Sequence, residues 1–300
     1  MAYALLLLPD FALIACGFAL CRFTPLNREL WDGVERLVYF LLFPALLFTA
    51  IVRFPLRIEA LFQLGGVALA IVGAGVVLAW SLKAWPGVDA HLHASGAQIA
   101  FRFNTYVALA LSERIAGVQG LAWVALLVAV CVPACNIAAV WPLARRGRQG
   151  VMRELARNPL IIATVTGLLA NLGGVQIPEL LSVTLQRIGA AALPLGLMAV
   201  GAGLRFGALR EGPGLALGLL GIRHLALPAL AIGLVIALEL PALQQAVVVA
   251  FAAMPTASSA YVLAARMGGH GSYVAGLVTV STLLAMPGLP LALAALSWLR

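Results

Sequence analysis

The chain has 300 residues, of which 63% are hydrophobic and 10% charged, and its mean hydropathy is +1.05. Soluble domains are closer to half apolar and a quarter charged, so this chain has too little polar surface for a water-soluble globule, and its solvent must be lipid. A net charge of +8 would suit a nucleic-acid partner only if the basic residues gathered on a soluble face, whereas here they punctuate apolar runs, which favours membrane topology and no nucleic acid.

Apolar runs between the charge clusters predict ten membrane-spanning helices, so the expected fold class is an all-α polytopic membrane protein. A span needs about 20 predominantly apolar residues. In chain order we expect spans at 3–21, 37–52, 61–82, 95–112, 119–143, 159–174, 182–204, 214–238, 242–265 and 272–297. The second run is short, and we expect its helix to extend back into 33–36. The first has no Lys or Arg before it and more spans after it, which favours a retained span over a signal peptide.

The orientation of the spans follows from the basic residues in alternate loops. The loops after the odd-numbered spans hold twelve Lys and Arg residues, whereas the opposite side holds four. Because cytoplasmic loops carry the excess of Lys and Arg, the loop at 145–157 is expected in the cytoplasm. We therefore expect a multi-pass protein of the bacterial inner membrane with both termini on the periplasmic side.

The two halves of the chain, 1–150 and 151–300, resemble each other. A shift of 150 residues superposes Pro9 on Pro159, Gly17 on Gly167 and Pro44 on Pro194, and with a drift of about one residue Asn104 meets Pro255. Each half holds five expected spans, an odd number, so the second half must enter the membrane from the opposite side. The sequence therefore predicts two inverted five-helix repeats, an architecture typical of secondary transporters.

The matched fourth and ninth spans carry the best binding-site residues. Transporters of inverted repeats bind substrate where broken helices leave backbone groups unpaired. Pro255 removes a backbone donor and is expected to break the ninth span, while Asn104 can both donate and accept at the matched position. The expected substrate-binding residues are Arg102, Asn104, Thr105, Tyr106, Pro255, Thr256, Ser258 and Ser259. The alternative is that the proline only kinks a helix and the hydroxyls only serve helix packing.

Several ionisable residues lie at apparent membrane depth. Arg102 stands two residues before Asn104 and could attract a carboxylate. For Arg187 and Arg223 we expect the side chain to reach the nearer membrane interface. Aspartate and glutamate are expected only in loops or at span ends, which disfavours a cation antiporter. No metal site, cofactor site, Walker sequence or zinc-protease motif is indicated.

Several strings resemble the auxin efflux carrier family. These are the Phe-Arg-Phe-Asn-Thr-Tyr of the fourth span, the Arg-Asn-Pro-Leu-Ile-Ile-Ala-Thr that begins at Arg157, and the Ala-Leu-Pro-Leu that begins at Ala192. The most specific is the Met-Pro-Thr-Ala-Ser-Ser-Ala-Tyr-Val-Leu-Ala that begins at Met254, and it is followed by the Val-Thr-Val-Ser-Thr-Leu-Leu that begins at Val278.

The resemblance implies a ten-helix fold in which broken spans 4 and 9 cross at the substrate site. It also implies a scaffold from about 1–60 and 155–210 and a mobile transport domain from about 61–150 and 211–300. Bacterial members of the family are associated with small organic anions such as malonate or malate. Auxin is not supported as the substrate, because the chain lacks the long hydrophilic central loop of many plant carriers. The glycine-rich fourth-span crossover of some relatives is also absent, which affects the geometry expected around Arg102.

The sequence thus predicts a carrier of a small mono- or dicarboxylate with elevator-type alternating access, and no enzymatic activity. Its expected partners are the anion and the lipid bilayer, and a homodimer is left open. The alternatives are an intramembrane lipid-modifying enzyme, which would need an acid/base pair or metal ligands at one depth, and an anion channel, which flux without counterflow would reveal.

Overall fold

The computed structural model describes residues 2–53, 58–143, 159–205, 211–257 and 259–299, and within these ranges the regular secondary structure is all helical, with no strand. Six helical stretches of the described chain are long and apolar enough to cross a membrane. They are Arg28–Arg53, Phe62–Ala84, Ala90–Val140, Glu179–Ala202, Pro213–Ala237 and Gly271–Trp298. Two shorter apolar helices, Pro159–Leu172 and Ala242–Ala253, accompany them. The all-helical membrane class expected from composition is therefore confirmed.

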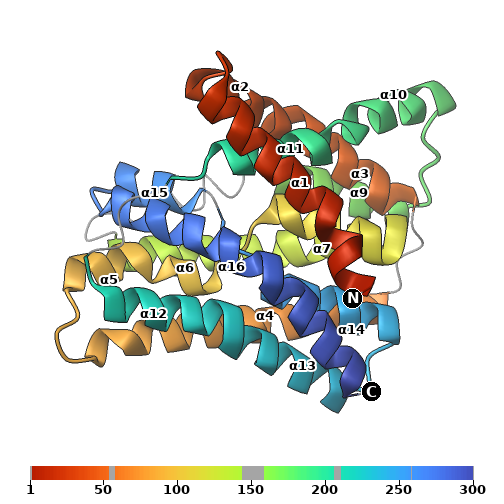
Figure 1. The fold of residues 1–300 in the computed structure, drawn as a ribbon. Helices are drawn as coiled ribbons and strands as arrows, with labels where there is room; N and C mark the ends of the chain where they lie inside the picture. The colour runs from red at the N-terminus through yellow and green to blue at the C-terminus, as the bar shows by residue number, and fades with distance from the viewer. Residues whose placement is uncertain (1, 54–57, 144–158, 206–210, 258, 300) are drawn as a thin grey trace.

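The helices pack into two bundles (Figure 1). In the first bundle α1 packs along α11, and α3 packs along α9 and α10. Its members are α1 (Ala2–Phe23), α2 (Arg28–Leu37), the π turn η1 (Val38–Leu42), α3 (Phe43–Arg53), α9 (Pro159–Leu172), α10 (Glu179–Ala190) and α11 (Ala192–Ala202).

In the second bundle α14 lies at the centre and contacts α4, α7, α13 and α16. Its members are α4 (Ile58–Ser81), the 3-10 turn η2 (Leu82–Ala84), α5 (Ala90–Gly96), α6 (Gln98–Phe101), α7 (Thr105–Leu143), α12 (Pro213–Gly221), the π turn η3 (Ile222–Ala226), α13 (Leu227–Ala237), α14 (Ala242–Ala253), α15 (Ala260–Arg266) and α16 (Gly271–Trp298). Helix α7 also touches α3, α9 and α11, so it forms much of the contact between the bundles.

Helix boundaries follow local chemistry more closely than hydropathy. The second span begins at Arg28, five residues before the expected extension at 33–36, because the Asn27 side chain accepts a hydrogen bond from the Leu30 backbone and caps α2. Helix α7 has non-helical backbone angles at Ala116 and Gly117, where Gly117 adopts a φ of 56°. It therefore consists of two helices. They are separated at 116–117, which lies between the fourth and fifth expected spans, 95–112 and 119–143.

Each π turn precedes a proline. Turn η1 ends two residues before Pro44, and η3 ends two residues before Pro228. A proline inside a helix has no N–H for the carbonyl four residues earlier, and its ring clashes with that carbonyl. The wider π turn relieves the clash without ending the helix. In η3 it also changes which side chains face the neighbouring helices.

Glycines bring the helices of the first bundle into close contact at two matched places. A Cβ atom on Gly17 of α1 would overlap the backbone of Met198 on α11. A Cβ on Gly167 of α9 would lie 3.4 Å from the Phe48 Cα on α3. Gly17 and Gly167 differ by 150 positions, as do Phe48 and Met198. The contact between α1 and α11 thus has its counterpart in the contact between α9 and α3.

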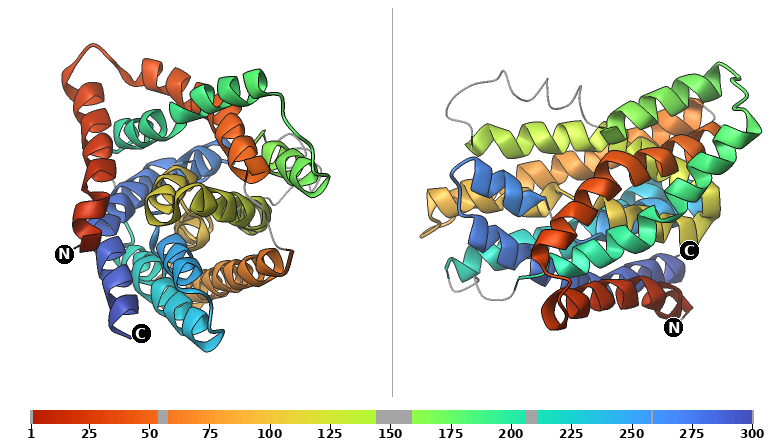
Figure 2. Two further views of the ribbon diagram at one scale, coloured as in Figure 1. Left: turned by 90° about the vertical axis from the view of Figure 1, so that its right-hand side faces the viewer. Right: turned by 90° about the horizontal axis from the view of Figure 1, so that it is seen from above.

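An ion pair joins the two bundles. The Arg114 guanidinium on α7 lies 2.7 Å from the Asp10 carboxylate on α1. The start of α1 and the end of α16 lie near each other in every view (Figures 1 and 2), and α1 contacts α16 directly. The two ends of the chain therefore lie at the same end of the molecule.

Candidate functional site

Two interrupted helices meet within the second bundle. The backbone is non-helical between α6 and α7 at 102–104, and again after α14 at 254–257. The Asn104 N–H donates to the Pro255 carbonyl at 2.9 Å, so the two interruptions are in direct contact. We call residues 102–104 and 254–257 the crossover. Both breaks occur at the positions that the sequence indicated.

Proline geometry accounts for the second break. A residue before proline is excluded from the helical region, and Met254 accordingly has an extended backbone, with φ −57° and ψ 151°. The last carbonyls of α14 therefore lose their partners within the helix. In the other segment of the crossover, residues 102–104, the backbone of Arg102 is extended as well, with φ −76° and ψ 147°.

Asn104 starts α7 and keeps one polar atom free. Its side-chain Oδ1 accepts hydrogen bonds from the backbone N–H groups of Tyr106 (3.0 Å) and Val107 (3.3 Å). Because both of these groups are donors, the oxygen must face the helix, and Nδ2 must point the other way. The side chain is 2% exposed, and Nδ2 has no hydrogen-bond partner. A buried amide donor without a partner is costly unless a ligand completes it.

Thr256 presents a second unpartnered group, on the other segment of the crossover. Its backbone N–H donates to the Ser281 hydroxyl of α16 at 2.9 Å, which fixes the chain after Pro255. Its own hydroxyl is buried without a partner. The crossover thus carries two polar groups without a hydrogen-bond partner, one on each of its two segments, and both can donate a hydrogen bond.

Arg102 connects the crossover to its surroundings. Its guanidinium donates to the Gln98 Oε1 at 3.2 Å, to the Asn136 Oδ1 at 3.0 Å and to the Ser259 hydroxyl at 3.5 Å. The structure therefore brings Arg102 and Ser259 together, although Ser259 is exposed. Asn136 was not singled out from sequence, because a lone amide in an apolar run gives no signal. Ser258 lies outside the described residues.

Tyr106 faces the other bundle. Its ring stacks on Phe43 of α3, with centroids 4.7 Å apart and planes 14° from parallel. Thr105 is the first residue of α7 and is partly buried. Both follow Asn104 directly, but Tyr106 lies at the contact between the bundles rather than within the crossover.

The expectation that Arg223 reaches the membrane interface was wrong. The side chain is 2% exposed, and its Nε donates to the Met254 carbonyl at 2.7 Å while Nη2 donates to the Phe251 carbonyl at 3.3 Å. The next residue, His224, contacts the Ser281 hydroxyl at 2.9 Å. Turn η3 thus directs Arg223 at the broken helix and His224 at the α16 serine that supports it. Pro228, four residues after His224, was the sequence signal for such a turn.

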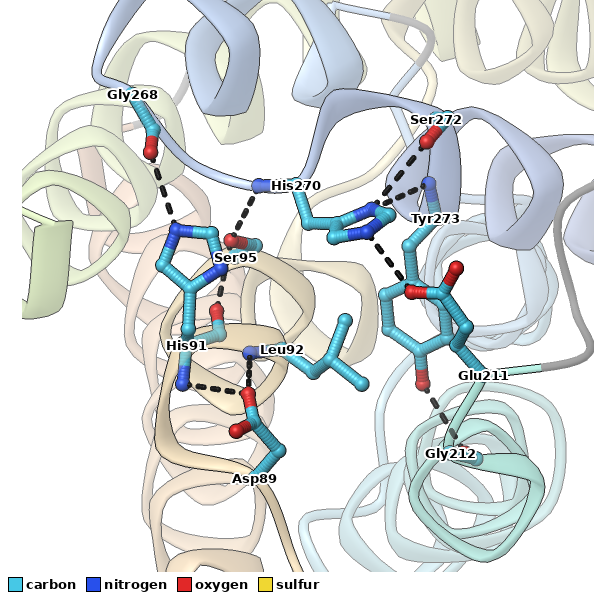
Figure 3. A network of polar contacts seen from close by, with 10 residues as sticks. All are labelled: Asp89, His91, Leu92, Ser95, Glu211, Gly212, Gly268, His270, Ser272 and Tyr273. Atoms are coloured by element: carbon cyan, nitrogen blue, oxygen red, sulfur yellow. Dashed lines mark hydrogen bonds and ion pairs between the residues drawn. The ribbon is translucent and has the colours of Figure 1, made fainter.

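A polar network joins the outer ends of the broken helices (Figure 3). The His91 Nε2 on α5 donates to the Gly268 carbonyl at 3.1 Å, and the His270 backbone donates to the Ser95 hydroxyl at 2.8 Å. The His270 ring lies 2.8 Å from the Glu211 carboxylate. These contacts tie α5 to the turn between α15 and α16 and to the start of α12. They hold the second bundle together at this end.

His91 and His93 both lie on α5, which begins at Ala90 because the Asp89 carboxylate caps it, but only His91 is exposed. His93 is consequently buried, and its Nε2 lies 2.8 Å from the Ala79 carbonyl.

Three residues of the crossover, Asn104, Pro255 and Thr256, are buried. A pocket lies in the first bundle, between α3 and α10, and none of the expected binding residues lines it. Among the described residues, no three His, Cys, Asp or Glu side chains gather as metal ligands. A ligand of the crossover would thus be held by amide, hydroxyl and guanidinium groups.

Comparison with known proteins identifies the family. A family model described as a membrane transport protein matches residues 95–293, about two thirds of the chain. The chain belongs to the auxin efflux carrier family. The resemblance inferred from sequence is thereby confirmed, and the matched region contains the whole crossover. No curated protein matches the chain significantly.

Membership in the auxin efflux carrier family identifies a multi-pass membrane transporter. The matched region also includes Arg223, His224 and Ser281, which support the second break from outside the crossover. The candidate site in this member of the family is a pair of broken helices together with the side chains that hold them.

Proposed function

We propose that this protein is a secondary transporter of a small organic anion, a mono- or dicarboxylate such as malonate or malate, which binds at the crossover. The observation that carries the proposal is the pair of unsatisfied groups, the Asn104 Nδ2 and the Thr256 hydroxyl. Both can donate to a carboxylate oxygen, and hydrogen bonds to charged groups are the stronger ones. Arg102 and Arg223 add positive charge on either side.

The proposal includes an inverted repeat with both termini on the periplasmic side. It is supported by the paired contacts of Gly17 with Met198 and of Gly167 with Phe48, since each residue lies 150 positions from its counterpart. It is also supported by the two chain ends, which lie at one end of the molecule (Figure 2). An even number of crossings, ten in our proposal, requires such an arrangement.

We further propose that the first bundle is the scaffold and that the second bundle carries the substrate across by an elevator-type movement. The crossover belongs wholly to the second bundle, so the site can move with it as a unit. The network in Figure 3 supports this rigid unit, because it links both broken helices to α12. Transport by rigid-body movement of one unit against another is common among inverted-repeat carriers.

An Asn104→Asp variant tests the site. Aspartate caps a helix as well as asparagine does, so α7 should still begin at Thr105. The free donor, however, becomes an anionic oxygen that repels a carboxylate. We expect uptake of radiolabelled malonate or malate into proteoliposomes to fall by about tenfold or more, because the variant loses one hydrogen bond to a charged group.

The matched control is Asn27→Asp, which alters the exposed cap of α2 and should leave uptake unchanged. Wild-type uptake by Asn104→Asp, or by Asn104→Ala or Pro255→Ala, would remove the site from the crossover. Flux above carrier turnover without counterflow would indicate a channel instead.

A further inference from the structure

Arg223 is a buried charge without an acidic partner. Its side chain is 2% exposed, and none of the ion pairs among the described residues includes it. What holds it is backbone: the Met254 and Phe251 carbonyls at the end of α14. The C-terminal end of a helix carries partial negative charge, so these carbonyls form a site suited to a cation.

Broken helices in secondary transporters commonly use such carbonyls for another purpose. Unwound backbone carbonyls and the C-terminal ends of half-helices coordinate the coupling cation, usually Na⁺. Here two carbonyls of this kind, at the break of the ninth span, already accept hydrogen bonds from a guanidinium that is fixed to η3. A second cation at the same carbonyls would meet direct charge repulsion from Arg223.

A backbone N–H of the break is held by a side chain as well. The first N–H after Pro255, that of Thr256, donates to Ser281, which also contacts His224. Two carbonyls and one N–H of the second break are therefore held by groups that belong to the chain itself. Among the described residues, the crossover side-chain atoms without a partner are the Asn104 Nδ2 and the Thr256 hydroxyl, and Arg223 has no acidic partner.

We propose that Arg223 is a built-in cation that replaces the coupling ion at the second break, so that anion transport by this protein needs no sodium. The role of Arg223 in anion transport rests on the proposed function. The absence of a sodium site does not rest on it. Arg223 acts as a positioning residue, since it holds the carbonyl end of α14 beside Pro255. Its charge also favours an anion in the crossover over a neutral compound.

The first experiment measures sodium directly and needs no substrate. Thermal unfolding of the purified protein is compared in sodium chloride and in choline chloride at equal ionic strength. A cation that binds the folded state would raise the unfolding temperature progressively with its concentration, roughly with the logarithm of the concentration once the site is occupied. We expect the same temperature in both salts at every concentration. An unfolding temperature that rises with sodium concentration and not with choline concentration would overturn the proposal.

The second experiment changes the built-in charge. Arg223→Gln removes the charge, whereas Arg223→Lys keeps it and retains donors for the carbonyls. At equal amounts of monodisperse protein, we expect malonate uptake to fall by tenfold or more in Arg223→Gln and to be at least partly restored in Arg223→Lys. The matched control is Arg187→Gln, which changes an exposed arginine of α10 and should leave uptake unaltered.

The outcomes separate the two proposals. Wild-type uptake by Arg223→Gln, or uptake by Arg223→Lys as low as that of Arg223→Gln, would overturn the role of Arg223. If Arg223→Gln does not fold, the sodium comparison on the unaltered protein decides alone. If the unaltered protein takes up neither malonate nor malate, the substrate proposed for the crossover fails, while the salt comparison still tests the built-in cation.

Discussion

The Thr256 hydroxyl and the Asn104 Nδ2 lie on the two different segments of the crossover, and both are buried without a hydrogen-bond partner. Neighbouring polar groups of the same break are satisfied, because Arg223 and Ser281 supply partners for the Met254 carbonyl and the Thr256 N–H. Within the second break, the unpartnered Thr256 hydroxyl is therefore an exception among satisfied neighbours. A substrate that accepts two hydrogen bonds would complete this hydroxyl and the Asn104 Nδ2.

Thr256→Val separates stability from transport. Valine has nearly the shape of threonine but lacks the hydroxyl, and a buried polar group without a partner costs about 1–3 kcal/mol. Removing it should leave the unfolding temperature equal or higher, while uptake of labelled malonate falls by about tenfold or more because a hydrogen bond to the charged substrate is lost. Thermal unfolding and proteoliposome uptake are measured on the same preparation.

Thr282→Val provides the comparison. Thr282 is also buried on α16, but its hydroxyl donates to the Val278 carbonyl at 2.9 Å. Its removal should lower stability slightly and spare uptake, the reverse of the pattern at Thr256. Equal effects of the two substitutions on uptake would contradict a ligand at Thr256.

At this scale the sequence identified the residues of the crossover but not those that support it. Pro255 and Asn104 stood out because a proline and an amide are rare in apolar runs and occur at matched positions. Arg223 was assigned to the membrane interface, since hydropathy carries no information on which face of a helix is buried. Asn136 and Ser281 gave no signal at all, because their roles depend on neighbours that the fold brings from 34 and 25 residues away.

At three prolines of this chain a helix ends or widens where the backbone loses a donor, whereas Pro9, Pro287 and Pro290 lie inside helices that continue through them. Pro255 ends α14, whereas Pro44 and Pro228 follow π turns inside longer helices. The sequence indicates all three prolines but not which of these outcomes each one produces. That depends on whether neighbouring side chains satisfy the freed carbonyls, as Arg223 does for the end of α14. Ten spans stay a prediction, since six helical stretches of the described chain are long and apolar enough to cross a membrane. The early start of α2 was missed because its cap is polar.

Close packing of α1 on α11 can be tested with a graded series of alanine substitutions. Gly17→Ala forces a methyl group into the Met198 backbone, and Gly167→Ala brings one to 3.4 Å from the Phe48 Cα, where a small shift suffices. Overpacking typically costs about 1–3 kcal/mol. We therefore expect the unfolding temperature to fall most in Gly17→Ala and less in Gly167→Ala.

Gly73→Ala is the control for this series. No atom lies within 4 Å of a Cβ at Gly73 of α4, so alanine should only improve helix propensity, by up to about 1 kcal/mol. Its unfolding temperature should be equal to or above that of the unaltered protein. A Gly17→Ala protein as stable as Gly73→Ala would contradict the close contact.

At the scale of the whole molecule, two bundles share a limited set of contacts. Helix α7 carries most of them, including the stack of Tyr106 on Phe43 and the ion pair of Arg114 with Asp10. The repeat expected from the sequence stays a prediction, which the corresponding contacts of Gly17 with Met198 and of Gly167 with Phe48 support. Which helices meet across the bundles could not be read from sequence, because hydropathy indicates spans but not their neighbours.

If the second bundle moves against the first, the ion pair between Asp10 and Arg114 has to separate. Its oxygen and nitrogen are 2.7 Å apart, and the Asp10 side chain is 13% exposed. Pairs near a surface contribute up to about 1 kcal/mol, equivalent to about fivefold in a two-state equilibrium. Asp10→Asn should therefore shift the population away from the arrangement described here by up to about fivefold.

Spin labels at Leu8 of α1 and Val118 of α7, both exposed, report the distance between the bundles when the four native cysteines are replaced by alanine. Double electron–electron resonance should reveal two distance populations, with the one that matches this structure reduced in Asp10→Asn. Asp32→Asn, which removes the carboxylate that pairs with Arg28 inside the first bundle, should leave the distribution unchanged. A single, unaltered distance in every variant, with and without malonate, would mean that the bundles do not move against each other and that the elevator-type mechanism is wrong.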